Sequence, residues 1–332
     1  MNKFLITGIT GFAGASLAQL LLSQGHEVHG VVRCPNGRDA DLLDTLTKEE
    51  HEAITFHYLD LKDYCGVAKL FEQYFDGVFH LAAQSHPPTS FKEPVMTWAD
   101  NVTATVNIIT AIEKQSKTLP FEGCNRTKLM FCSTSEVYGD SCTGEPLKTT
   151  DKLTPSNPYA TSKAAMDLYM QERMTNGFIN GYITRAFSHT GIRRGYNFSI
   201  SSDAFQIAKM KHGLQKKVLK IGNLKTKRVV MDVRDCVNAY YLLMMNEGSS
   251  GNIYNVCGDT VHEMQYFTDT LIKLSGLEGV VQEIEPKFYR DIDIQIQIGD
   301  STALKDLTGW TQEFEIETTL SDLLNYWVKK LA

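Results

Sequence analysis

The sequence is short of the features that mark membrane, secreted and nucleic-acid-binding proteins. No apolar run reaches the length of about 20 residues that a transmembrane helix needs, and the opening MNKFLITG runs directly into a predicted strand. The seven cysteines include no C-x-x-C pair, and the net charge of -6 lacks the basic excess of nucleic-acid binders. We expect a cytoplasmic protein with reduced thiols, no metal site, and no membrane or nucleic-acid partner.

Internal repeats and low-complexity segments are also absent. The length of 332 residues is enough for one large domain or two smaller ones. Short apolar runs alternate with helical patterns through the first part of the chain. Beyond the first two strands, this pattern predicts strands at 53–61, 77–83, around Met130 and at 181–187, and a helix over 96–115. It is typical of an α/β protein with a Rossmann-type, doubly wound parallel sheet, which binds ligands at the carboxyl ends of its strands.

A glycine-rich turn joins the first predicted strand to the first helix. Gly8, Gly11 and Gly14 permit, in order, a tight turn, a close approach to a pyrophosphate and tight packing of the helix on the strand. The unpaired N–H groups of the helix N-terminus would face the phosphates. The alternative is a purely structural turn, but the position inside a β-α-β unit favours dinucleotide binding, with Thr10 and Phe12 in the same loop.

The end of the second strand bears on which dinucleotide is bound. An NAD site usually has an acidic residue there for the ribose hydroxyls, whereas an NADP site favours arginine. The strand EVHGVVR ends in Arg33, and no acidic residue follows before Asp39. Arg33 could be a solvated residue at a strand end, but we expect it to bind the 2′-phosphate of NADP.

Polar residues cluster where the later strands end. Asp60 and Leu61 end the third strand and could border an adenine. The fourth strand ends in Leu81-Ala82-Ala83-Gln84, with Ser85 and His86 behind it, and the fifth ends in Ser133-Thr134-Ser135-Glu136. Serine and threonine are also common in turns, but these three ends meet where such a sheet holds its ligand.

Tyr159 and Lys163 lie four residues apart on a predicted helix, in NPYATSK. This spacing puts both side chains on one face, where the ammonium would favour the phenolate and lower the pKa of the tyrosine. An ordinary exposed Tyr/Lys pair is the alternative. The upstream glycine motif favours a general base.

The chain becomes less regular after Gly191, and a basic stretch at 209–228 stands out. It could be one solvated helix face, or a cationic rim for a substrate diphosphate that includes Lys220 and Arg228. We expect an NADP-binding domain over 1–190, to which later segments return, and a smaller mixed substrate region over 191–332.

Together these motifs resemble an extended short-chain dehydrogenase/reductase acting on nucleotide sugars, and in detail the GDP-mannose 4,6-dehydratase family. The resemblance covers nearly the whole chain: VHGVVR, HLAAQSH, STSEVYG, RRGYNF and the segment from IEPKFYR to TGW all follow the family pattern. It implies NADP as cofactor, a GDP-linked sugar as substrate and a homodimer or homotetramer. In the family, the RRG loop helps bind NADP across a tetramer interface, and Arg193 and Arg194 occupy those positions.

The resemblance implies roles for individual residues. Thr134 and Glu136 match the family's catalytic pair. Tyr159 with Lys163 would take the C4 hydroxyl proton while the C4 hydride passes to NADP+, so that Glu136 could remove the C5 proton and assist departure of the C6 hydroxyl. The expected cofactor-binding set is Gly8, Thr10, Gly11, Phe12, Gly14, Arg33, Asp60, Leu61, Leu81, Ala82, Ala83, Gln84, Tyr159, Lys163, His189 and Arg194. The expected substrate-binding set is Ser85, His86, Ser135, Glu136, Ser188, Lys220, Arg228 and Arg290.

Three departures bear on the substrate. Ser188 replaces an asparagine that helps hold the diphosphate, NLKTKRVVMD is closer to related reductases and epimerases, and an arginine-proline pair has become Arg290-Asp291. A GDP-heptose or another GDP-hexose is therefore as plausible as GDP-mannose. A GDP-sugar reductase or epimerase, a UDP-glucuronate decarboxylase and a non-catalytic NADP-binding regulator are the alternatives, but Glu136 favours the dehydratase because a reductase has no evident use for it.

Overall fold

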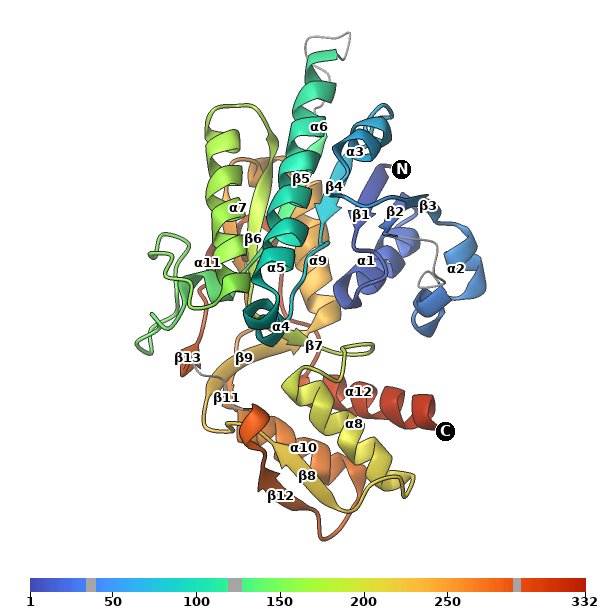
Figure 1. Cartoon of the computed structure of the whole chain (residues 1–332), viewed down its shortest axis with the longest axis vertical. Coiled ribbons are helices and arrows are strands. Elements are labelled where there is room, and N and C mark those ends of the chain that lie inside the picture. Colours follow the sequence, from blue (N-terminus) through green and yellow to red (C-terminus); the bar gives the residue numbers. More distant parts are fainter. Residues whose placement is uncertain (34–39, 119–126, 289–293) are drawn as a thin grey trace.

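The computed structural model describes residues 1–33, 40–118, 127–288 and 294–332. Within these ranges seven strands form one parallel sheet in the order β10-β6-β5-β4-β1-β2-β3 (Figure 1). The strands are β1 (Lys3–Thr7), β2 (Glu27–Val32), β3 (Thr55–Tyr58), β4 (Gly77–His80), β5 (Lys128–Thr134), β6 (Asn180–Ala186) and β10 (Ile253–Val256). This confirms the predicted fold class.

Helices cover both faces of this sheet. Alternate residues of β1 point to opposite faces, so that Phe4 and Ile6 belong to one buried cluster and Leu5 to another. The first cluster is covered by α1 (Phe12–Ser23), α9 (Val233–Met245) and α11 (Thr302–Thr308), and the second by α3 (Tyr64–Leu70), α6 (Ala104–Thr118) and α7 (Pro158–Thr175). Buried strands between two helical layers explain the unbroken apolar runs of the sequence.

The predicted helix over 96–115 is part of a longer helical segment. It comprises α5 (Pro94–Trp98), a π-helical turn (Ala99–Thr103) and α6. Two short helices, α2 (Lys48–Glu52) and α4 (Pro87–Lys92), lie in the connections after β2 and β4. No helix in the described ranges is long and apolar enough to cross a membrane.

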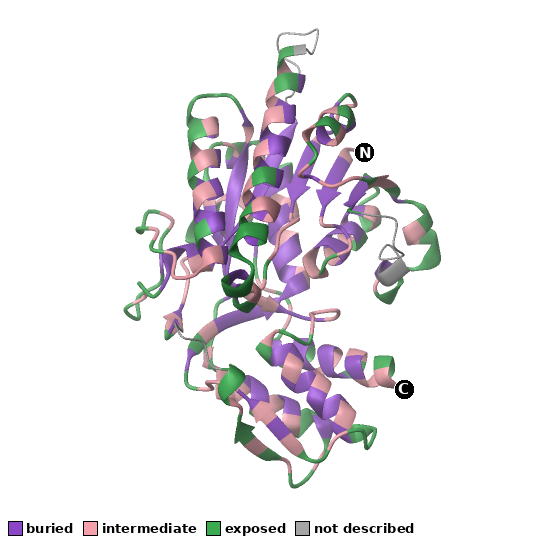
Figure 2. Ribbon diagram, in the orientation of Figure 1, coloured by how far each residue is buried: buried purple, intermediate pink, exposed green. Residues whose placement is uncertain are grey.

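A smaller lobe packs below the carboxyl ends of the strands, with its own buried centre (Figures 1 and 2). Its helices are α8 (Ser199–Lys211), α10 (Met264–Ser275) and α12 (Ile316–Leu331). Its strands are β7 (Ser188–Thr190), β8 (Val218–Ile221), β9 (Lys227–Asp232), β11 (Val261–Glu263), β12 (Val281–Ile284) and β13 (Ile296–Gln297). Between the segments of this lobe the chain returns to the large sheet as α9 and β10.

The order of the large sheet reverses between β1 and β4, which lie side by side although β2 and β3 separate them in the sequence. The connections leave in opposite directions at such a point, and the gap between them is where an open α/β sheet binds its ligand. The loops after β1, β4 and β5 meet there, facing the smaller lobe.

Candidate active site

The loop between β1 and α1 has the shape of a phosphate cradle. Gly8 has a φ of +73°, and a Cβ there would lie 2.8 Å from the backbone nitrogen of Ala82. A Cβ on Gly14 would lie 2.3 Å from the carbonyl oxygen of Gly8, so only glycine lets α1 start this close to the strand. No side chain caps the first turn of α1, whose N-cap residue is Gly11. These residues therefore fit the pyrophosphate of a dinucleotide.

Buried hydrogen bonds hold the end of β4 beside this cradle. The imidazole of His80 contacts the Thr7 hydroxyl at 2.7 Å and the Thr105 hydroxyl at 2.9 Å. Burial lowers the pKa of His80 to about 3, so the ring stays neutral. The hydroxyl of Thr7 also accepts a hydrogen bond from the backbone N–H of Ala82 at 3.2 Å, which fixes Leu81–Ala83 against the glycine loop.

Two cationic side chains, Arg33 and Lys62, lie at the end of the cavity that would hold the adenosine of a dinucleotide. Arg33 is 3.6 Å from the carboxylate of Asp100, and the ammonium of Lys62 donates a 2.5 Å hydrogen bond to the other oxygen of the same carboxylate. Lys62 is also 3.3 Å from Asp60. The hydrogen bond that Lys62 donates to Asp100 raises the pKa of Lys62, which is therefore charged near neutral pH. Arg33 thus lies where it was predicted, and Lys62 adds a second cation that the sequence analysis did not single out.

The opposite end of the site combines a threonine, a glutamate, a tyrosine and a lysine. Thr134 ends β5, and its hydroxyl accepts a hydrogen bond from the Glu136 N–H at 3.2 Å. Asn157 starts α7: its side-chain oxygen accepts a hydrogen bond from Ala160 N–H at 2.8 Å, and its amide donates to the Glu136 carboxylate at 2.7 Å. One residue therefore fixes both the start of the helix that carries Tyr159 and the direction of Glu136.

The expected lowering of the Tyr159 pKa is wrong. Burial raises the pKa of Tyr159 above its ordinary value and the negative charge of Glu136 adds to this, although the Thr134 hydrogen bond and the Arg194 charge act in the lowering direction. The ammonium of Lys163 donates to the carbonyl oxygen of Cys132 at 2.6 Å, and burial lowers the pKa of Lys163. Helical spacing predicted the shared face of the pair but not how deeply both groups are buried.

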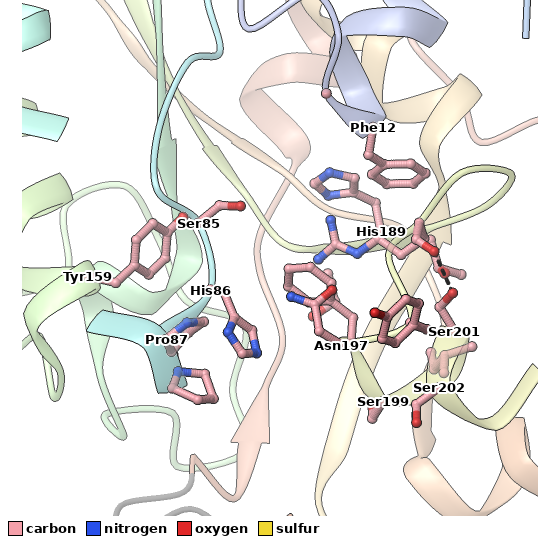
Figure 3. A pocket seen from close by; sticks show the side chains of 18 of the residues that line it. Phe12, Ser85, His86, Pro87, Tyr159, His189, Asn197, Ser199, Ser201 and Ser202 are labelled. Atoms are coloured by element: carbon pink, nitrogen blue, oxygen red, sulfur yellow. Dashed lines mark hydrogen bonds between the residues drawn. The ribbon is translucent and has the colours of Figure 1, made fainter. Parts of the chain in front are cut away.

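One cavity of about 1840 Å³ extends from the glycine loop to β8 and is lined by residues of both regions. A drug-sized ligand usually occupies a pocket of roughly 300–1,000 Å³, so this volume suits two ligands side by side. Figure 3 shows Tyr159, Ser85 and His86 on one side of the cavity and Phe12 and His189 on the other. The rings of Phe12 and His189 stack at 5.7 Å.

An arginine in the cavity lining lies against two aromatic rings. The guanidinium of Arg194 lies 3.5 Å from the ring centre of Phe198 and 5.0 Å from that of Phe12. Burial lowers the pKa of Arg194 to about 10, so it remains a cation at neutral pH. Its neighbour Arg193 donates a 3.1 Å hydrogen bond to the Thr10 carbonyl oxygen of the same chain.

Comparison with known proteins agrees with this arrangement. The family model described as GDP-mannose 4,6 dehydratase matches residues 5–323. The chain belongs to this family. A GDP-6-deoxy-D-mannose reductase from Pseudomonas aeruginosa is 29% identical, over 99% of this chain and 98% of that protein. A GDP-mannose 4,6-dehydratase from Vibrio cholerae is 28% identical, over 97% and 93%.

Solved structures in the same superfamily share the fold. The structure described as RMD from Pseudomonas aeruginosa complexed with NADPH has a TM-score of 0.80 and 25% identity to this chain. The match covers 99% of each chain. The relatives thus include both a dehydratase and a reductase, and the family uses nicotinamide dinucleotides as cofactors.

The cavity is lined by nearly all the residues that the sequence predicted for the cofactor, substrate and catalytic sites. It is lined by Gly8, Thr10, Gly11, Phe12, Gly14, Arg33, Asp60, Leu61, Leu81, Ala82, Ala83, Ser85, His86, Thr134, Ser135, Glu136, Tyr159, Lys163, Ser188, His189, Arg194, Lys220 and Arg228.

Two of the predicted site residues, Gln84 and Arg290, are not among the described residues that line the cavity. Gln84 is absent from the lining: its amide donates to the Thr97 hydroxyl at 2.9 Å and its side-chain oxygen accepts from the His86 N–H at 2.5 Å. Gln84 therefore braces the loop after β4. Arg290 lies outside the described residues.

The basic stretch at 209–228 is not one solvated helix face. It covers the end of α8, a loop, β8 and the start of β9. Lys209, Lys216, Lys220 and Arg228 all line the cavity. In β8, lysine alternates with apolar residues because one face of the strand is turned to the cavity and the other packs on the small lobe. The prediction of a helix face did not include this alternation.

Proposed function

We propose that the chain is a GDP-sugar 4,6-dehydratase, which converts a GDP-hexose or GDP-heptose into the 4-keto-6-deoxy sugar with NADP as cofactor. The observation that carries this proposal is the placing of Glu136. Its carboxylate is directed by Asn157 in the loop that also carries Thr134, next to buried Tyr159. A reductase needs a proton donor at C4 but no second acid/base group.

The proposed cofactor contacts follow from the geometry. The glycine loop would hold the pyrophosphate, and Arg33 with Lys62 would hold the 2′-phosphate that distinguishes NADP from NAD. The chemistry that NADP would supply at this site is reversible hydride transfer, from C4 of the sugar and later to C6. Because the same hydride returns, the net reaction is loss of one water without consumption of cofactor.

The first proton transfer belongs to Tyr159. Its phenolate would take the C4 hydroxyl proton as C4 becomes a ketone, with the Thr134 hydroxyl hydrogen-bonded to it. Since burial raises the pKa of Tyr159, its phenolate needs nearby positive charge. Arg194 supplies some of it from within the cavity. The nearby Lys163 ammonium would supply more.

The second transfer belongs to Glu136. A C4 ketone makes the C5 proton acidic, and the Glu136 carboxylate would remove it. The protonated Glu136 would then give a proton to the departing C6 hydroxyl, which leaves as water. The Asn157 amide holds Glu136 in place through both steps. As the hydride adds to C6, C5 would take up a proton in equilibrium with solvent, and Tyr159 would release to solvent the proton it took from C4.

A GDP-4-keto-6-deoxy-sugar reductase is the second candidate. It is favoured by the reductase relative, which is 29% identical over nearly the whole chain. The two candidates differ in cofactor use, since a reductase consumes one NADPH for each product.

The test is incubation of purified protein with GDP-mannose or GDP-manno-heptose and a catalytic amount of NADP+, read by mass spectrometry. We expect many turnovers per cofactor and a product that has lost one water. Failure to convert either sugar, together with formation of product from a GDP-4-keto-6-deoxy sugar at the expense of one NADPH each, would instead establish the reductase.

A further inference from the structure

Helix α8 presents a polar face to the far end of the cavity, beyond the catalytic residues. Its Ser199 and Ser202 point into the pocket in Figure 3. Asp203, Gln206 and Lys209 continue this face along the helix and also line the cavity. The far end is where the nucleotide part of a long nucleotide-sugar would lie, since the reacting sugar has to reach Tyr159.

Asp203 on this face is a buried carboxylate with few hydrogen-bond donors around it in the part of the chain that the structure describes. It is 6% exposed, and within the described ranges it accepts one hydrogen bond, from the Thr268 hydroxyl at 2.7 Å. Burial raises the pKa of Asp203 to about 7. Among the described residues no lysine, arginine or histidine forms a salt bridge with it, whereas buried Asp167 pairs with Arg185 at 2.9 Å.

A buried carboxylate has room for about four hydrogen bonds and is costly when few are made. The neighbouring Gln206 cannot serve the ligand in its place. The Gln206 amide donates to the Lys220 carbonyl oxygen at 2.9 Å, and its side-chain oxygen accepts from the Lys220 N–H at 2.9 Å. Gln206 is therefore committed to β8, and Asp203 is the acceptor on this face with capacity left for a ligand.

We propose that Asp203 accepts paired hydrogen bonds from the N1–H and 2-amino groups of a guanine base and so selects GDP-linked substrates. The proposal rests on the proposed function and names its specificity-determining residue. Guanine has two adjacent N–H donors on this edge, which match a carboxylate. Uracil and thymine place carbonyl oxygens on both sides of their single N–H, and adenine and cytosine place a ring-nitrogen acceptor beside their amino group. A carboxylate repels those acceptors.

The test compares binding of GDP, IDP and UDP by titration calorimetry, without turnover. IDP differs from GDP only in lacking the 2-amino group. A hydrogen bond to a charged group contributes about 1.5–3 kcal/mol, so each is equivalent to roughly 10- to 100-fold in affinity. We expect wild-type protein to bind GDP at least about tenfold more tightly than IDP. We expect Asp203→Asn to lose about 10- to 100-fold in GDP affinity and to bind GDP and IDP within about threefold of each other.

Asp235→Asn is the matched control. Asp235 is equally buried but lies outside the cavity lining, and it accepts backbone hydrogen bonds from Glu313 and Phe314 at 2.9 and 3.2 Å. This variant should keep the wild-type preference for GDP over IDP, which separates loss of a guanine contact from a general effect of removing a buried charge.

The outcomes distinguish the two proposals. An Asp203→Asn protein that keeps the wild-type preference for GDP over IDP would overturn the role of Asp203 and leave the dehydratase untouched. Wild-type protein that binds UDP as tightly as GDP would overturn both the role of Asp203 and the GDP-linked substrate. A guanine preference that Asp203→Asn removes, in a protein that never dehydrates, would support Asp203 and contradict the proposed reaction alone.

Discussion

At the residue scale, one of the two proposed acid/base groups, Glu136, opposes ionisation of the other, Tyr159. The charge of Glu136 raises the pKa of Tyr159, and burial acts in the same direction. A phenol that resists ionisation is poorly suited to act first, unless cations in the same cavity compensate. Arg194 lowers the pKa of Tyr159, and its guanidinium is held between two aromatic rings. The site therefore balances one negative and at least one positive charge around a buried phenol.

Replacing Glu136 with leucine should separate the two proton transfers. Without the carboxylate, dehydration should fall by about 10²- to 10⁴-fold, which is the usual contribution of one positioned acid/base group. Oxidation at C4 should survive, because Tyr159 and Lys163 remain and the Tyr159 pKa loses the raising effect of Glu136. Stopped-flow absorbance would show trapped NADPH without water loss. Glu145→Leu, at an exposed position, is the control and should dehydrate at the wild-type rate, whereas a Glu136→Leu protein that did so too would remove Glu136 from the mechanism.

The choice between NADP and NAD should depend on Arg33 and Lys62, which share the Asp100 carboxylate. Loss of one charged contact to the 2′-phosphate typically weakens binding by about 10- to 100-fold. Arg33→Ala and Lys62→Ala should each weaken NADP+ by this amount and leave NAD+ nearly unchanged, as measured by titration calorimetry. Lys48→Ala removes an exposed cation from α2 and should change neither. Equal weakening of both cofactors would exclude the 2′-phosphate as the contact.

At the element scale, the site is built from strand ends and helix starts, and this part of the molecule was predictable. Short apolar runs with glycine, serine or acidic residues behind them located β1 to β6. Five of these strands are largely buried and leave a clear apolar pattern, whereas β3, at the edge of the sheet, is only partly buried. The glycine loop and the Tyr159 helix followed from local spacing. The segments that return as α9 and β10 carry no local mark of their destination, since sheet order is decided by packing.

Individual contacts between residues far apart in the chain could not be predicted from the sequence either. Asn157 could be expected to cap a helix before Pro158, but its hydrogen bond to Glu136 spans 21 positions and has no spacing signature. Lys62 directly follows the predicted pair Asp60-Leu61, yet its link to Asp100 depends on how two loops meet. Burial, which reverses the expected direction of the Tyr159 pKa, is a property of the packed molecule.

The start of α1 gives an element-scale prediction. A Cβ at Gly14 would lie 2.3 Å from the Gly8 carbonyl oxygen, so Gly14→Ala must push the helix away from the strand. We expect cofactor affinity to fall at least about tenfold, since the N–H groups at the helix start no longer converge on the pyrophosphate.

Gly25→Ala provides the matched change at the other end of α1. Gly25 has a φ of +74° and nothing within 4 Å of an added Cβ, so alanine there costs about 1–2 kcal/mol of backbone strain. It should lower the melting temperature and leave cofactor affinity unchanged. If Gly14→Ala binds the cofactor as tightly as Gly25→Ala does, the glycine loop is only a structural turn.

At the scale of the whole molecule, an apolar surface remains uncovered on the helices beside the cavity. Val95, Met96 and Trp98 on α5 are 78%, 50% and 47% exposed, and Leu168 on the adjacent α7 is 57% exposed. A patch of this kind usually marks an interface. It lies on α5 and α7, and the family resemblance implies a homodimer or homotetramer.

We therefore expect a homodimer, with a light-scattering mass of twice 37.3 kDa. Replacing Trp98 and Leu168 together with glutamate should give a monomer, whereas Leu214→Glu, at an exposed position beyond α8, should leave the dimer intact. A wild-type monomer, or a dimer that survives the double substitution, would show that the interface lies elsewhere. Because Arg193 and Arg194 make contacts within their own chain, saturating NADP+ should not convert the dimer into a tetramer.

Isotope labelling tests the central claim, internal hydride transfer with Glu136 as the second acid/base group, most directly. GDP-sugar deuterated at C4 should be turned over in H2O, and unlabelled substrate in D2O, each with catalytic NADP+. We predict that C4 deuterium appears at C6 of the product and that solvent deuterium appears at C5, with one water lost. The account is contradicted if neither GDP-sugar loses water and the protein instead reduces the corresponding GDP-4-keto-6-deoxy sugar, with one NADPH consumed and its hydride delivered to C4 for each product.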